Sequence, residues 1–164
     1  MAVLQWIQNL RISTSIAESD SLWWGYAWWL FIHAVGMGLT AGLGFIVCLR
    51  LLGVGRQIPV SSFRVLFPLF WIGFYVNLLS GTLLFMTDAT GIARVWELYA
   101  KLVCLGLALV VMSRLRRFID SDQSEGAIPP QIRSMAYACI VLWLAVITSG
   151  RLIAYAVEAN GATI

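Results

Sequence analysis

His33 is the residue of this sequence best suited to chemistry, because it is the only histidine and stands inside a long apolar stretch. Neutral imidazole is a common metal ligand, and an ionisable side chain deep in an apolar helix normally faces the interior of a helix bundle. Gly36 and Thr40 continue the same helical face, which leaves a slot beside the histidine for a flat cofactor or for another helix. The pattern predicts that His33 is a metal ligand, with Gly36 beside the cofactor.

Lys101 and Arg151 are two basic residues in other apolar stretches. Counted at 1.5 Å per residue from the predicted outer ends of their helices, both lie about 10 Å below the membrane surface. Two cations at matched depth suit a pair of carboxylates, and the propionates of haem b are such a pair. His33 would then lie about 6 Å deeper, where the haem iron belongs.

Both groups of residues also have an interpretation that needs no cofactor. Asn77 lies at about the depth of His33 in the next apolar stretch, so the two side chains can hydrogen-bond directly. Glu97 and Glu158 lie one and two helical turns from the two cations, so ion pairs can neutralise the basic group. The sequence leaves these alternatives open.

Four long apolar segments must position these residues. Hydrophobic residues make up 60% of the 164 and charged residues only 12%, about half the charged share of a soluble domain. Each segment exceeds the roughly 20 residues that cross the hydrocarbon core of a bilayer. We therefore expect an all-α polytopic membrane protein, a single domain over residues 1–164, folded as a four-transmembrane-helix bundle with spans at about 22–49, 64–86, 95–117 and 131–157.

Residues 1–20 precede the first span and include a short segment, 3–16, that is too polar to cross a bilayer. Trp6, Ile7 and Leu10 fall near one face of a helix over that segment. This pattern predicts an N-terminal amphipathic helix lying in the outer headgroup region.

The arginines predict the orientation in the membrane. They crowd the flanks of the 53–62 and 118–130 loops, whereas the opposite side carries few basic residues. Cytoplasmic loops carry the excess of lysine and arginine. We expect both loops in the cytoplasm and both termini in the periplasm, in the inner membrane of a bacterium.

The expected partners are the lipid bilayer and other protein chains. Ala34, Gly38 and Gly42 repeat every four residues, a spacing that lets helices approach closely in lipid. This stripe predicts a homo-oligomer or a place in a larger membrane complex. The net charge of +3 is small and lies on loops, so no nucleic-acid partner is expected.

Several segments together resemble a known family. They are residues 29–36 (WLFIHAVG), 49–53 (LRLLG), 80–85 (SGTLLF) and 150–155 (GRLIAY), together with Gly42, Lys101 and Trp143. Over nearly its whole length the chain resembles a bacterial family of four-span membrane proteins, a domain of unknown function. More distantly it is similar to CopD-type copper-resistance membrane domains and to b-type cytochrome bundles. That distant resemblance implies that histidine binds metal or haem among apolar helices.

The function that we expect is a membrane-embedded electron-transfer subunit near the periplasmic face, holding haem b or a related tetrapyrrole. His33 would be the axial ligand, Lys101 and Arg151 the propionate partners, and Gly36 the point of close approach. Met37 lies one turn away on the same helix, so a second ligand must come from another copy, or the iron stays five-coordinate. Two other functions stay open: a non-catalytic structural subunit, and a small anion or metal-ion transporter.

Overall fold

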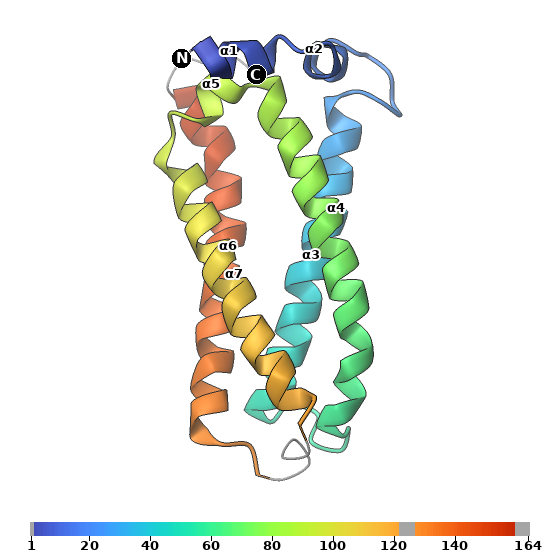
Figure 1. Ribbon diagram of the computed structural model, residues 1–164, viewed down its shortest axis with the longest axis vertical. Coiled ribbons are helices and arrows are strands. Elements are labelled where there is room, and N and C mark those ends of the chain that lie inside the picture. Colours follow the sequence, from blue (N-terminus) through green and yellow to red (C-terminus); the bar gives the residue numbers. More distant parts are fainter. Residues whose placement is uncertain (1, 122–126, 160–164) are drawn as a thin grey trace.

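The computed structural model describes residues 2–121 and 127–159, and every regular element within them is helical. The elements are α1 (Ala2–Gln8), α2 (Arg11–Ala17), α3 (Tyr26–Leu52), the 3-10 helix η1 (Val60–Val65), α4 (Leu66–Thr87), α5 (Ala89–Ile92), α6 (Trp96–Ile119) and α7 (Pro130–Ala159). The helices α3, α4, α6 and α7 run along the long axis of the molecule (Figure 1). Each is long and apolar enough to cross a membrane, α4 together with η1. The predicted all-α bundle of four candidate spans is therefore confirmed.

The first spanning helix begins at Tyr26, whereas the sequence predicted residue 22. A tight turn causes the difference, because the backbone oxygen of Ser21 accepts from the backbone N–H groups of Trp24 at 3.3 Å and Gly25 at 2.9 Å. Gly25 is buried in this turn, and a Cβ on it would lie 2.9 Å from the Ser21 oxygen. Trp23 and Trp24 therefore precede the helix that they were expected to open.

The four long helices form two hairpins, α3 with α4 and α6 with α7. Glycines allow the first hairpin to close tightly. A Cβ on Gly36 would lie 2.7 Å from the backbone nitrogen of Asn77, and a Cβ on Gly73 would lie 2.6 Å from the Cβ of Leu39. Such distances leave no room for a side chain, so the backbones of α3 and α4 touch at these points.

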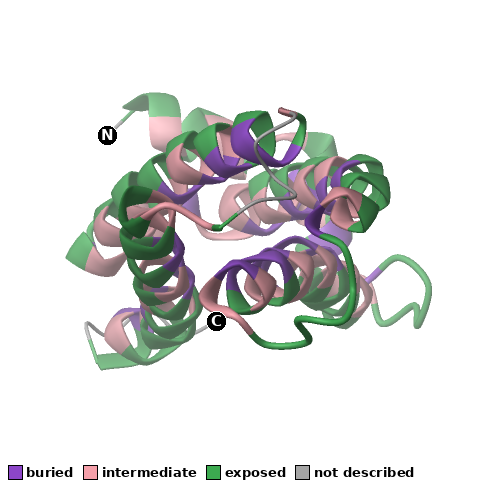
Figure 2. Cartoon of the chain, turned by 90° about the horizontal axis from the view of Figure 1, so that it is seen from below, coloured by how far each residue is buried: buried purple, intermediate pink, exposed green. Residues whose placement is uncertain are grey.

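The two hairpins pack against each other through α3 and α7 in the half of the bundle farthest from α1. Trp143 and Met112 are buried there, and a Cβ on Gly44 would lie 2.8 Å from Trp143 Nε1. Seen from below (Figure 2), the buried residues lie on the helix faces that turn toward one another, with exposed residues outside. Large apolar side chains on the outside suit a lipid environment.

The N-terminal segment lies across one end of the bundle (Figure 1). The sequence predicted one helix over 3–16, whereas the structure has two, α1 and α2, with extended backbone at Leu10 between them. Ser13 Oγ donates to the Met86 backbone oxygen at 2.7 Å, and Gln8 Oε1 accepts from the Thr90 hydroxyl at 2.9 Å. These bonds tie the segment to α4 and α5.

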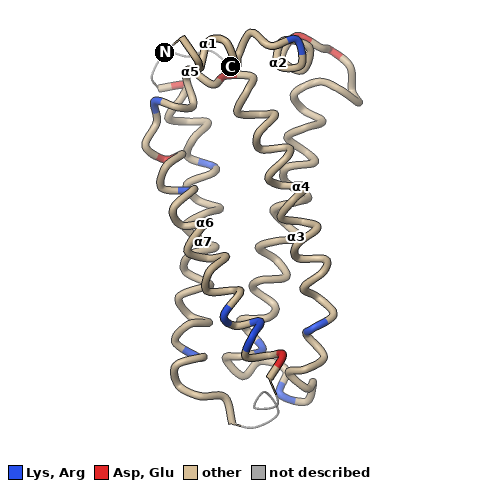
Figure 3. The backbone as a smooth tube through the Cα atoms, viewed as in Figure 1, with Lys and Arg blue, Asp and Glu red and all other residues tan. Residues whose placement is uncertain are grey.

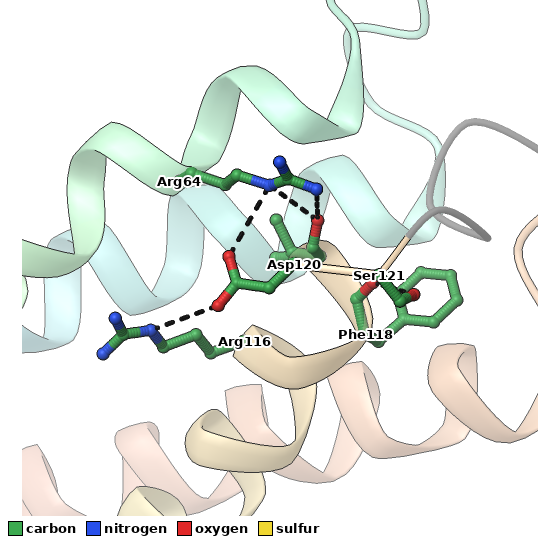
Figure 4. A network of polar contacts seen from close by, with 6 residues as sticks. Arg64, Arg116, Phe118, Asp120 and Ser121 are labelled. Atoms are coloured by element: carbon green, nitrogen blue, oxygen red, sulfur yellow. Dashed lines mark hydrogen bonds and ion pairs between the residues drawn. The ribbon is translucent and has the colours of Figure 1, made fainter.

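Basic residues gather at the opposite end of the bundle (Figure 3). Arg64 there donates from Nε and Nη2 to the Ile119 backbone oxygen, at 3.0 and 2.9 Å, and so satisfies the C-terminal end of α6. Asp120 lies 3.5 Å from both Arg64 and Arg116 (Figure 4). The predicted 118–130 loop starts at this network, and its residues 122–126 lie outside the described part of the chain.

Candidate functional site

A cavity of about 400 Å³ lies between the two hairpins, in the half of the bundle nearest α1 and α5. All four long helices line it. Its walls are mostly apolar, and its polar lining includes His33, Lys101, Arg151 and Asp88. This volume falls within the range of roughly 300–1,000 Å³ that is usual for small-molecule sites. Three of the four residues expected to bind a cofactor are therefore brought together.

The His33 ring is oriented by α4. Its Nδ1 lies 3.0 Å from the Asn77 backbone oxygen and 3.2 Å from Ser80 Oγ. A carbonyl oxygen only accepts, so this contact assigns the proton to Nδ1 and leaves the lone pair on Nε2. Asn77 Nδ2 in turn donates to the His33 backbone oxygen at 2.8 Å. The two side chains also meet directly, with Asn77 Nδ2 3.5 Å from His33 Nε2, so the predicted contact between His33 and Asn77 is confirmed.

Gly81 gives the His33 ring its place against α4. A Cβ on this glycine would lie 2.8 Å from His33 Cε1 and 3.2 Å from Nδ1. The absence of a side chain at Gly81 therefore lets Cε1 and Nδ1 of the imidazole lie close to the α4 backbone. In the sequence Gly81 stands within the segment 80–85, and its spacing along α4 gives no sign of this role.

Lys101 reaches His33 from the other hairpin. Its Nζ lies 3.4 Å from His33 Nε2. Residue counts along each helix predicted that His33 lies about 6 Å deeper than Lys101. The structure differs because the long lysine side chain extends toward the histidine. Gly150 on α7 lies beside it, since a Cβ there would be in van der Waals contact with Nζ at 3.4 Å.

Arg151 lines the cavity from its rim and is exposed. Its Nη2 lies 3.3 Å from the Tyr155 hydroxyl, and the guanidinium carbon lies 5.3 Å from the centre of the Tyr155 ring. Stacking on an aromatic face holds the charge in place without neutralising it.

The predicted ion pairs of the two cations are not found within residues 2–121 and 127–159. The salt bridges there, at N–O distances up to 4.0 Å, join Asp120 to Arg64 and Arg116 at the far end of the bundle. Glu97 Oε2 is buried without a hydrogen-bond partner. Within the described part of the chain, Lys101 and Arg151 therefore line the cavity without a salt bridge to an acidic side chain.

Gly36 does not lie at the cavity. Its Cα faces the Asn77 backbone, as described above, so Gly36 serves the contact between α3 and α4. A periodic pattern shows which residues share a helical face but not which neighbour that face meets. The close approach expected at Gly36 is made to another helix, the alternative that the sequence left open.

Asp88 lines the cavity but is not among the residues that the sequence predicted to be functional. It precedes α5 and accepts at Oδ1 from the Gly91 backbone N–H at 3.1 Å, whereas its Oδ2 is buried without a partner. The sequence feature that could have pointed to Asp88 is its place at the N-cap of a short helix, a position that favours aspartate.

The described residues contain no group of three His, Cys, Asp or Glu side chains that could hold a bare metal ion.

No family model matches this sequence, and neither a curated protein nor a solved structure matches it.

Proposed function

We propose that this chain is a membrane-embedded subunit that binds haem b, or a related tetrapyrrole, between its two hairpins and passes electrons near the periplasmic face. The observation that carries the proposal is the orientation of His33. Its Nδ1 donates its proton to the Asn77 carbonyl, and its Nε2 lies at the cavity wall, 3.4 Å from Lys101 Nζ and 3.5 Å from Asn77 Nδ2.

This arrangement is the one that metal-binding histidines use. A ligating histidine almost always donates its other ring N–H to a carbonyl, carboxylate or water, which fixes the tautomer and increases the basicity of the ligating nitrogen. Asn77 and Gly81 supply that support here, through the accepting carbonyl and the space for the ring.

The walls of the cavity suit a flat apolar ring with acidic substituents. Leu84, Phe85 and Ile153 are among the apolar residues that line it, and Arg151 lies at its rim without an acidic partner among the described residues. Arg151 is therefore placed to receive a propionate by a charge-assisted hydrogen bond. Haem, when bound, supplies one-electron chemistry, while the protein orients it and sets its electrostatic surroundings.

A titration of haem b into the purified protein in detergent tests this function. We expect a saturable shift of the Soret band for the wild type, and its loss in His33→Ala. The affinity should fall by more than the roughly 10–100-fold that loss of an outer-shell partner costs. Gly106→Ala is the matched control, because Gly106 is exposed and a Cβ there meets nothing within 4 Å. Equal titrations for the wild type and His33→Ala would refute the proposal.

A second function, a non-catalytic structural subunit, is favoured by one observation. Gly38 and Gly42 present an open face on α3, where a Cβ on either would meet nothing within 4 Å. A glycine face that its own chain leaves open suits contact with another helix. This function needs no cofactor, so a protein that binds no haem but assembles through this face would support it.

A further inference from the structure

We propose that the cavity binds a long-chain carboxylic acid of the bilayer, such as a fatty acid, with its carboxylate at Lys101 and Arg151. This inference goes beyond haem binding and stands without it, because it depends on the charge of Lys101 and not on a metal at His33.

A chain of hydrogen bonds orients the Lys101 ammonium in the cavity. His33 donates from Nδ1 to the Asn77 backbone oxygen at 3.0 Å, so its Nε2 is an acceptor, and Lys101 Nζ lies 3.4 Å from that nitrogen. This contact uses one of the three N–H groups of the ammonium. A neutral imidazole holds the ammonium in place without neutralising it, so the charge and two N–H groups are left for a ligand.

The charge of Lys101 has no counterion within the described part of the chain. Lys101 stands about 8 Å along α6 from its first residue, Trp96, at 1.5 Å per residue. Asp88 is the acidic residue of the cavity lining, but its carboxylate is not within 4.0 Å of a nitrogen of Lys101 or Arg151. A charged side chain inside a spanning helix is normally paired. The anion of a bound ligand would complete the pairing.

Arg151 provides a second cation close to the first. The Lys101 ammonium lies beside Gly150, the residue before Arg151, where a Cβ would be 3.4 Å from Nζ. The Arg151 guanidinium stacks on the Tyr155 ring at 5.3 Å, a contact that leaves its charge unpaired by an acidic group. A carboxylate has two oxygens and can accept from an ammonium and a guanidinium at once.

The cavity opens toward the bilayer between α3 and α7. Leu30 and Ala34 line it from α3, Ile147 and Arg151 line it from α7, and all four residues are exposed. Exposed apolar side chains of spanning helices face lipid tails, which are equally apolar. A ligand dissolved in the bilayer can therefore enter from the side and leave its apolar chain against these two helices.

The size of the cavity favours an acid with one apolar chain. Its volume of about 400 Å³ lies in the lower part of the range of small-molecule sites, and its walls are mostly apolar. A single chain with a small head group suits this space better than the two acyl chains and larger head group of a phospholipid. In the haem-bound protein, a propionate would take the place of this carboxylate.

Native mass spectrometry of the haem-free protein in a non-ionic detergent tests this inference, because it identifies each bound molecule by its mass. The probes are palmitic acid, hexadecanol, which has the same chain length without the charge, and phosphatidylglycerol, whose anion is a phosphate. We expect one palmitate per chain. Hexadecanol and phosphatidylglycerol should bind about tenfold more weakly or less, the factor expected when a hydrogen bond between charged groups is lost.

Substitutions of the two cations then locate the site. Lys101→Met removes the charge but keeps an unbranched apolar side chain, and it should weaken palmitate binding by about tenfold or more. Arg151→Gln, at the exposed rim, should also weaken it and keeps the test decisive if Lys101→Met folds poorly. Arg94→Gln is the matched control, because Arg94 is an exposed cation near the same end of α6 but does not line the cavity.

His33→Gln distinguishes this site from the haem site. Glutamine can still accept from Lys101, so palmitate binding should be retained although haem binding should be lost. Equal affinity of the wild type for palmitate and hexadecanol, tighter binding of phosphatidylglycerol, or unchanged palmitate binding in both Lys101→Met and Arg151→Gln would overturn the inference. A wild type that binds haem but no palmitate would overturn it alone. One that binds palmitate but no haem would overturn the proposed function alone.

Discussion

His33 and Asn77 hold each other at two points. The Asn77 backbone oxygen lies 3.0 Å from His33 Nδ1, and the Asn77 side-chain amide donates to the His33 backbone oxygen at 2.8 Å. The pair fixes both the rotation of the imidazole ring and the register of α3 against α4. A ring held in this way keeps Nε2 at the cavity wall, 3.4 Å from Lys101 Nζ.

The contact between α3 and α4 predicts that alanine substitutions at two neighbouring glycines change the free energy of unfolding by very different amounts. Gly36→Ala should destabilise the protein by about 1–3 kcal/mol, because its Cβ would lie 2.7 Å from the backbone of Asn77, which cannot turn aside as a side chain can. Gly38→Ala should be neutral or stabilising by up to about 1 kcal/mol, since alanine favours the helix and its Cβ meets nothing within 4 Å. Unfolding of both variants in mixed detergent micelles measures the difference. Equal stability of the two would show that α3 and α4 are not packed as described.

Replacement of His33 by glutamine distinguishes a role of this residue in haem binding from a role in the stability of the fold. A glutamine side chain can still donate to the Asn77 carbonyl and accept from Lys101, so His33→Gln should keep the free energy of unfolding of the cofactor-free protein within about 1 kcal/mol, on the scale of an interhelical hydrogen bond in lipid. Haem binding should nevertheless be lost, because an amide is a poor ligand for haem iron. Unfolding in detergent and the haem titration give the two readings. A variant that binds haem normally would mean that His33 is not the ligand.

The orientation in the membrane stays a prediction that cysteine labelling can test. Ser62 is exposed beside the arginine-rich loops, and Asp20 is exposed at the end that carries α2. A membrane-impermeant maleimide added to spheroplasts should label Asp20→Cys, and it should reach Ser62→Cys only after the membrane is opened. Cys48 and Cys139 are buried, so their contribution to the background should be small. Labelling of Ser62→Cys in intact spheroplasts would reverse the predicted topology.

Association through the open glycine face of α3 is the prediction for the structural function. Replacing Gly38 and Gly42 by leucine should convert an oligomer to monomers, because the added side chains prevent close approach of a second helix. Gly106→Leu is the matched control, since Gly106 is equally open and lies on α6. Light scattering of the detergent-solubilised protein gives the mass. An unchanged mass for the double variant would place any interface elsewhere.

The sequence predicts the large features of this fold because they follow from composition and length. Apolar runs of sufficient length give the four helices, and matched depth along two of them predicts the contact between His33 and Asn77. Depth counting fails for Lys101 because it follows the backbone and ignores the reach of a long side chain. The role of Gly81 could not be predicted, since it depends on which helix lies against it.

The most direct test of the proposed function is the absorption spectrum of the protein purified from bacterial membranes, with haem counted per chain. We predict a Soret band and about one haem b per chain in the wild type, loss of both in His33→Ala, and retention of both in Gly106→Ala. A folded wild-type protein without a Soret band, even after incubation with haem, would contradict the account and leave the His33, Asn77 and Lys101 contacts as a means of joining the helices.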